Sequence, residues 1–228
     1  MKDLDDATTA AAAARRRPIA ARDTSWAQTA ARWLIGTGLR PNAISVLSVV
    51  FAALGSSTLL FSRSIPGVAG KVALLVFAGL CIQARLLCNL FDGMVAVEGG
   101  FRSKAGEIYN ELPDRISDAL LLVCAGYAAA PWTGWERDLG WLAATLAVLT
   151  AYVRTLGVQA GAAPQFCGPM AKQQRMATLT AACALTAGET LLGWPWRVLT
   201  VALGLIALGS LANIVRRTWR IVRDLEAR

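Results

Sequence analysis

Histidine is absent from the 228 residues of this chain, and cysteine occurs at only five positions. Without histidine there is no imidazole to act as a general acid, a general base or a metal ligand. The cysteines mostly lie within apolar segments and form no pair with the spacing of a metal site: Cys81, Cys88, Cys124, Cys167 and Cys183. We therefore expect the cysteines to pack in the core.

Acidic residues are also scarce, because 15 Asp and Glu stand against 23 Lys and Arg, which gives a net charge of +8. The basic residues flank apolar runs and form no single patch, so we expect a phospholipid membrane with anionic lipid as the partner, and no nucleic acid. Hydrophobic residues make up 55% of the chain and the mean hydropathy is +0.47. Both values exceed those of an ordinary soluble domain and indicate a membrane protein.

Six apolar stretches predict the fold, an all-α polytopic membrane protein with about six transmembrane helices. They cover residues 43–61, 70–92, 107–130, 138–158, 175–192 and 196–214. Six crossings place both termini on one side, and only four basic residues then lie on the other: Arg63, Lys71, Arg137 and Arg197. The positive-inside rule makes the basic side cytoplasmic, which predicts a multi-pass protein of the inner membrane.

The N-terminal part divides in two. Residues 1–21 are alanine-rich, polar and basic, and we expect a disordered tail there, followed by a single membrane-embedded domain over residues 22–228. Residues 24–37 carry Trp26, Ala30, Trp33 and Leu34 at helical spacing, which favours an interfacial amphipathic helix. A helix packed on the bundle is an equally good interpretation. Pro41 follows, and Asn42 or Ser45 is expected to cap the next helix.

Polar residues concentrate between residues 89 and 118, which hold 6 of the 15 acidic side chains. Asn89 and Asp92 share one helix face, and a second stripe recurs at intervals of three and four through Glu107, Asn110, Glu111, Asp114 and Asp118. Two facing helices with such stripes predict a cage for a hard divalent cation. The alternative is a salt-bridged helix mouth, whose counterions are Arg85, Arg102, Lys104 and Arg115.

This spacing resembles the signature of the CDP-alcohol phosphatidyltransferases, Asp-x2-Asp-Gly-x2-Ala-Arg-x8-Gly-x3-Asp-x3-Asp. Every interval fits, and five of the eight fixed positions match: Asp92, Gly93, Ala96, Gly106 and Asp114. Asn89 and Asn110 replace aspartates, and Val97 replaces the arginine. The element Pro41-Asn42-x-x-Ser45 is also similar to one that precedes the first span of this family.

The resemblance implies an enzyme of phospholipid biosynthesis. It would transfer a phosphatidyl group from a CDP-linked lipid, such as CDP-diacylglycerol, to a small alcohol acceptor with release of CMP. It implies Mg²⁺ or Mn²⁺ as cofactor, Asp114 as the catalytic base, and a metal site of Asn89, Asp92, Asn110 and Asp114. The CDP-binding residues would be Asn42, Asn89, Asp92, Gly93 and Ala96.

The two asparagines remove two negative charges from the implied metal site, and we expect Glu111, helped by Glu107, to restore part of that charge. Two outcomes stay open: an active transferase with a rebuilt metal site, or a relic that binds CDP-lipid or acts as a membrane scaffold without turnover. The sequence also leaves a homodimer open.

A second polar group follows the acidic stretch. Arg154 ends the fourth span, and Lys172 and Arg175 share one face where the fifth begins. Arginine suits bidentate phosphate binding, so these three are the predicted site for an acceptor phosphate, as in a phosphorylated polyol. The alternative is that they only hold the loop on the cytoplasmic side.

Overall fold

The computed structural model describes residues 22, 24–101, 105–129, 134–166 and 168–227. The described residues form seven helices and no strand, so the all-α prediction is confirmed. They are α2 (Ser25–Gly36), α3 (Pro41–Ser62), α4 (Val68–Glu98), α5 (Gly106–Ala129), α6 (Glu136–Gln159), α7 (Lys172–Leu191) and α8 (Val198–Glu226). The predicted tail, residues 1–21, lies outside the described residues, as do Arg102 and Lys104 and the side chain of Glu107.

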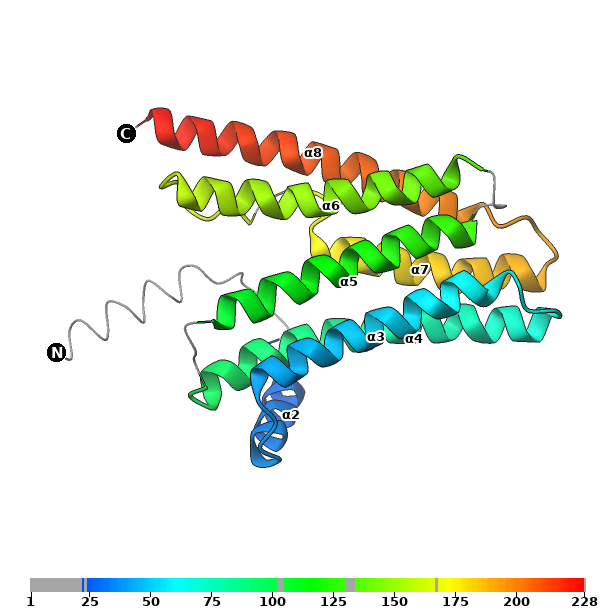
Figure 1. Ribbon diagram of the computed structural model, residues 1–228, viewed down its shortest axis with the longest axis horizontal. Coiled ribbons are helices and arrows are strands. Elements are labelled where there is room, and N and C mark those ends of the chain that lie inside the picture. The colour runs from blue at the N-terminus through cyan, green and yellow to red at the C-terminus, as the bar shows by residue number, and fades with distance from the viewer. Residues whose placement is uncertain (1–21, 23, 102–104, 130–133, 167, 228) are drawn as a thin grey trace.

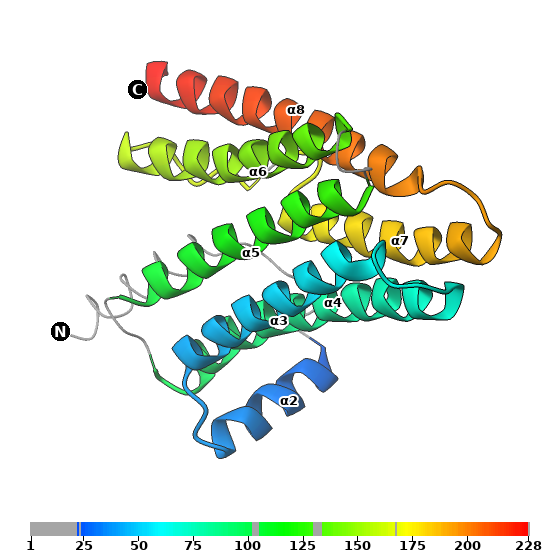
Figure 2. The same ribbon diagram turned by 45° about the vertical axis from the view of Figure 1, so that its right-hand side comes forward.

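Six long helices run lengthwise beside one another, and α2 lies across one end of the bundle (Figure 1). Helix α3 contacts α4 and α5, α5 contacts α6, and α7 contacts both α4 and α8. The turned view separates α6 and α8 on one side from α3 and α4 on the other (Figure 2). The C-terminal part of α4 and the N-terminal part of α5 therefore reach the same end of the bundle, where the polar residues of the sequence lie.

Four helices are long and apolar enough to cross a membrane: α3, α4, α6 and α8. Helices α5 and α7 occupy two of the six predicted spans but are not among the four. Helix α5 carries Glu111, Asp114, Arg115 and Asp118 within three turns, and α7 begins with Lys172. The chain has the helices of a polytopic membrane protein, and the number of six crossings remains a prediction.

The helix ends differ from the sequence expectation at several places, and α8 extends to Glu226, well past the predicted end at position 214. Helix α4 continues to Glu98, so Asp92 and Gly93 lie within a helix and not at its end. Pro41 is the first residue of α3, where a proline loses no helical hydrogen bond, and Arg40 is the N-cap residue with no side-chain cap bond. The prediction that Asn42 or Ser45 caps α3 is therefore wrong.

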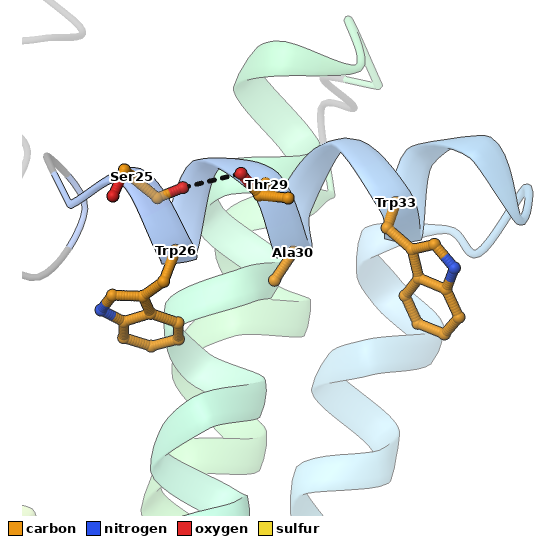
Figure 3. Close-up of a pocket in the computed structure, with 5 residues that line it drawn as sticks. All are labelled: Ser25, Trp26, Thr29, Ala30 and Trp33. Carbon is orange, nitrogen blue, oxygen red and sulfur yellow. Dashed lines mark hydrogen bonds between the residues drawn. The ribbon is translucent and has the colours of Figure 1, made fainter.

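Helix α2 packs on α4 through small residues, because Ala27 and Ala31 are buried in one apolar cluster with Leu90 and Met94. Trp26 and Trp33 remain 52% and 68% exposed, and they line an open pocket with Ser25, Thr29 and Ala30 (Figure 3). The helix therefore combines the two predicted interpretations: one face packs on the bundle, and the tryptophan face is available to an interface.

The main core is formed by buried residues of the six long helices, α3 to α8, and is rich in alanine and leucine. Helices α5 and α6 approach closely, because a Cβ added to Gly126 would lie 2.8 Å from the Cα of Gly140. Only glycine permits this contact between the two backbones. The four cysteines that the structure describes are free and buried, as expected for core packing.

Candidate functional site

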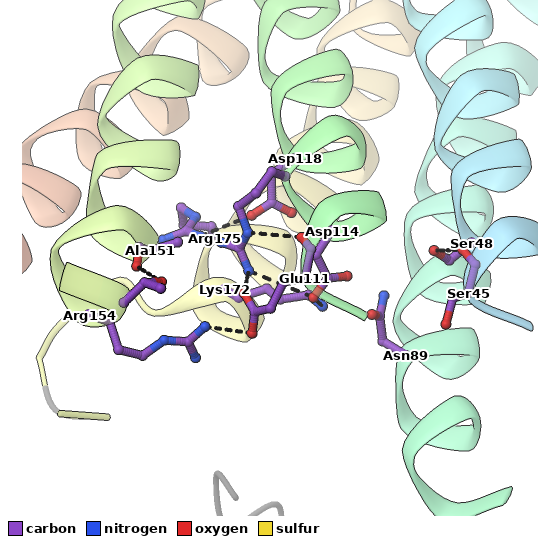
Figure 4. Close-up of polar contacts among 12 residues, drawn as sticks. Ser45, Ser48, Asn89, Glu111, Asp114, Asp118, Ala151, Arg154, Lys172 and Arg175 are labelled. Atoms are coloured by element: carbon purple, nitrogen blue, oxygen red, sulfur yellow. Dashed lines mark hydrogen bonds and ion pairs between the residues drawn. The ribbon is translucent and has the colours of Figure 1, made fainter. Parts of the chain in front are cut away.

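Several of the predicted site residues lie at one end of the bundle, on α4, α5, α6 and α7 (Figure 4). Three carboxylates and five cations of this region form what we call the ion-pair cluster. Its members are Glu111, Asp114 and Asp118 with Arg85, Arg115, Arg154, Lys172 and Arg175.

Asp118 forms the innermost part of the cluster. Its Oδ1 accepts a hydrogen bond from Nη2 of Arg85 at 2.6 Å, and its Oδ2 accepts one from Nη2 of Arg175 at 2.9 Å. Asp118 and Arg175 are each 1% exposed and Arg85 is fully buried. A buried charge is tolerated only when it is paired, so these residues hold α4, α5 and α7 in one fixed arrangement.

Asp114 lies one turn nearer the bundle end and faces three cations. Lys172 Nζ donates to its Oδ2, Arg85 Nη2 lies 3.4 Å from its Oδ1, and Arg115 Nη2 lies 3.8 Å from its Oδ2. Lys172 begins α7, outside the four apolar helices, and burial lowers the pKa of its ammonium to about 8, although Asp114 acts in the opposite direction. The carboxylate predicted as the catalytic base is thus already neutralised by cations of the chain itself.

Glu111 lies nearest the mouth of the site and bridges two helices. Its Oε1 accepts from Arg154 Nη2 at 2.5 Å, and its Oε2 accepts from Arg115 Nη2 at 3.2 Å. The guanidinium of Arg154 also lies over the ring of Phe166, 5.7 Å from its centroid. Glu111 therefore joins α5 to α6, and its charge is shared between two arginines.

Asp92 is the other carboxylate of the signature, and it bonds to α3. Its Oδ2 accepts a hydrogen bond from the Ser45 hydroxyl at 2.8 Å, and Asp92 is only 4% exposed. Nδ2 of Asn89 donates to the backbone oxygen of Arg85 at 3.0 Å. A Cβ at Gly93 would lie 3.2 Å from Nη2 of Arg22, so the N-terminal segment approaches the helix at this glycine.

Some predicted residues do not join these contacts. Asn110 is exposed, and Asn42 is the partly buried second residue of α3. The three predicted acceptor-phosphate residues do not form one free group, because Arg154, Lys172 and Arg175 each pair with a different carboxylate. Their roles toward an acceptor stay predictions.

The side chains that could serve as metal ligands do not fit the carboxylate-rich metal site that the resemblance implies. No group of three or more His, Cys, Asp or Glu side chains that could hold a metal ion occurs in the part of the chain that is described. Asp114 and Glu111 are bound to cations, and Asp92 accepts from Ser45. A hard divalent cation prefers several oxygen ligands of negative charge, and this arrangement offers it few.

Arg85, Ser45 and Arg115 were not predicted as site residues, and Asp118 was predicted as part of the acidic stripe but given no role of its own. Ser45 had a sequence signal in its place after Pro41 and Asn42, and Asp118 continues the stripe of Asp114 one turn further. Arg85 and Arg115 were expected only as counterions. Each of these two arginines lies between two carboxylates because of how the helices pack. The periodicity within one helix does not reveal that packing.

Comparisons with known proteins support the fold. No family model matches the chain, and no curated protein matches its sequence. Its structure is similar to three crystal structures of the phosphatidylinositol phosphate synthase of Mycobacterium tuberculosis: one with manganese and citrate, one with CDP-DAG bound, and one in apo form. The TM-scores are 0.69, 0.68 and 0.67 at 20%, 21% and 18% identity, over 86% of this chain and 88%, 92% and 95% of the other. At such identities the likeness establishes the fold, and the activity has to be argued from the residues.

Proposed function

We propose that this chain is a membrane-embedded CDP-alcohol phosphatidyltransferase of phospholipid biosynthesis. The observation that carries the proposal is the signature frame on α4 and α5. Asp92, Gly93, Ala96, Gly106 and Asp114 keep the spacing of that family. They do so on a fold shared with a phosphatidylinositol phosphate synthase.

The donor is a CDP-linked lipid. One support is the similar structure that has CDP-DAG bound. Another is the pair of small residues Gly93 and Ala96 in the C-terminal part of α4. With Asn42, Asn89 and Asp92 they are the proposed CDP-binding residues. The close approach of Arg22 to Gly93 places a cation at the same segment, which favours a phosphate-bearing ligand there.

The proposed reaction is a substitution at the lipid-bearing phosphorus of the donor. The acceptor hydroxyl oxygen forms the new P–O bond, the bond to the CMP oxygen breaks, and CMP leaves. Asp114 takes the proton of the hydroxyl, which requires that Lys172 release it. An anionic donor supplies a reason for that release, because its diphosphate competes with Asp114 for the ammonium.

The acceptor is proposed to be a phosphorylated polyol whose phosphate is bound chiefly by Arg154, next to Lys172, which also contacts the donor, and with Arg175 behind them. Arg154 and Lys172 are partly exposed, whereas Arg175 is buried against Asp118. A phosphate that reached this place would meet two cations at the mouth of the site.

Binding of CDP-lipid without turnover is the second candidate. The contact of Lys172 with Asp114 favours it, since a base held by an ammonium accepts a proton poorly. The asparagines at positions 89 and 110 point the same way.

Mg²⁺ or Mn²⁺ remains a prediction for this chain, because the manganese belongs to the similar structure and the ligand set here is less charged. The inner membrane, a cytoplasmic active site and a homodimer are likewise proposals. The helices α3, α4, α6 and α8 support the membrane part of them.

CMP release from CDP-diacylglycerol by the purified protein separates the two candidates. A transferase releases CMP when a phosphorylated polyol is added, and Asp114→Asn abolishes this release while donor binding persists. A binding protein binds the donor and releases no CMP with any acceptor. Absence of donor binding would contradict both.

A further inference from the structure

The carboxylates at the signature positions are already balanced by charges of the chain. Positions 89, 92, 110 and 114 hold two aspartates and two asparagines. Asp114 is paired with Lys172, Arg85 and Arg115. The ion-pair cluster holds five cations and three carboxylates, so it stays cationic even when Asp92 is added. A site of this charge has little attraction for a divalent cation and a strong one for an anion.

Exposure divides the five cations into two groups. The side chains of Arg85 and Arg175 are 0% and 2% exposed and serve Asp118 inside the bundle. Those of Lys172, Arg115 and Arg154 are 16%, 20% and 22% exposed, and they lie nearer the mouth. The outer three are accessible to a ligand at the surface, while the inner two hold Asp118, and Arg85 also reaches Asp114.

The outer cations are of the kinds that bind phosphate oxygens. They come from α5, α6 and α7 and pair with Asp114 and Glu111. Figure 4 shows Lys172 and Arg154 beside these two carboxylates. Two of them are arginines, which bind phosphate oxygens in bidentate fashion, and the third is an ammonium on a flexible stem. Each cation is bound to a carboxylate in this structure. A phosphate oxygen can replace that carboxylate oxygen, and the cation then keeps its number of hydrogen bonds.

We infer that Lys172 and Arg115 replace the divalent ion, so that the diphosphate of a CDP-linked lipid binds directly to these two cations without a metal ion, while Arg154 is left for the acceptor phosphate. The inference rests on the proposed function, since it concerns the donor of that reaction. Lys172 moves from Asp114 to the diphosphate when the donor arrives. No covalent bond is made or broken in this step, and the Oδ2 of Asp114 loses the ammonium while its Oδ1 keeps Arg85.

The test measures binding of CDP-diacylglycerol to the full chain in lipid nanodiscs, once with EDTA and once with Mn²⁺. The variants are Lys172→Gln, Lys172→Arg and, as a matched control, Lys71→Gln near the start of α4 at the other end of the bundle. Mn²⁺ bound to each protein is measured in parallel by electron paramagnetic resonance, which reports the metal independently of turnover.

The wild type is expected to bind the donor equally with EDTA and with Mn²⁺. Lys172→Gln should bind it about tenfold more weakly in EDTA, and Lys172→Arg and Lys71→Gln should be close to the wild type. Lys172→Gln removes the nearest of the three cations around Asp114, so this variant should hold more Mn²⁺ than the wild type.

Binding of the donor by the wild type only with Mn²⁺ would overturn the inference and leave the proposed function intact. Absence of binding under both conditions would overturn both. Unchanged affinity of Lys172→Gln in EDTA would remove Lys172 from the donor site. The comparison of wild type in EDTA and Mn²⁺ needs no variant, so a folding defect in Lys172→Gln cannot hide the answer.

Discussion

Asp118→Asn is the substitution that most directly perturbs the inner half of the site. The Asp118 carboxylate accepts from Arg85 at 2.6 Å and from Arg175 at 2.9 Å, and it is 1% exposed. Asparagine keeps the shape but removes the charge and turns an NH₂ toward one of the two guanidinium groups. Loss of one partner of a buried ion pair costs about 3–5 kcal/mol.

The lower end of that range applies here, because Arg85 keeps the Asp114 carboxylate at 3.4 Å. A loss of about 3 kcal/mol changes the ratio of folded to unfolded protein by roughly two orders of magnitude. The midpoint of denaturant or thermal unfolding in detergent micelles measures the effect. Glu226→Gln, on the exposed end of α8, makes the same chemical change and should leave the midpoint unaltered. If the unfolding midpoints of both variants equal that of the wild type, Asp118 does not hold the bundle together.

Three further predictions concern packing, topology and the acceptor. Gly126→Ala should destabilise the protein by about 1–3 kcal/mol, because its Cβ would lie 2.8 Å from the Cα of Gly140, whereas Gly204→Ala, with open space around it, should be neutral or stabilising in the same unfolding assay. In a cysteine-free background, Ser64→Cys should react with an impermeant thiol reagent from outside the cell and Gln159→Cys only after the membrane is opened; the reverse labelling would contradict the cytoplasmic placement of the site. Arg154→Ala should raise the apparent KM for a phosphorylated acceptor far more than that for the donor, and equal effects on both in steady-state kinetics would argue against a phosphate role for Arg154.

The helices could be predicted from the sequence because long apolar runs leave little choice of structure. The six predicted spans coincide with α3 to α8. The two polar stripes lie at the same end of the bundle, but α5 packs chiefly on α3 and α6, and the side chain of Arg85 links α4 to Asp114 and Asp118. The exact helix ends were harder to predict. Helix α4 continues six residues past the predicted end at position 92, since polar residues such as Glu98 can continue a helix beyond an apolar run.

The pairing within the site could not be predicted, because it depends on contacts between helices. The spacing of Lys172 and Arg175 shows that they share a face, but it does not show that one binds Asp114 and the other Asp118. Glu111 was expected to supplement a metal site, and in the structure it binds Arg154 and Arg115. A role of Glu111 as a metal ligand remains a prediction, to be tested by metal titration of the wild type and of Glu111→Gln.

The central claim is that this chain transfers a phosphatidyl group from a CDP-linked lipid. The most direct measurement incubates the purified protein in nanodiscs with CDP-diacylglycerol and a phosphorylated polyol, and quantifies CMP and the new phospholipid by mass spectrometry. The account predicts that both products appear in equal amounts, and that Asp114→Asn forms neither. CMP without a new lipid, or equal product from the wild type and Asp114→Asn, would contradict it.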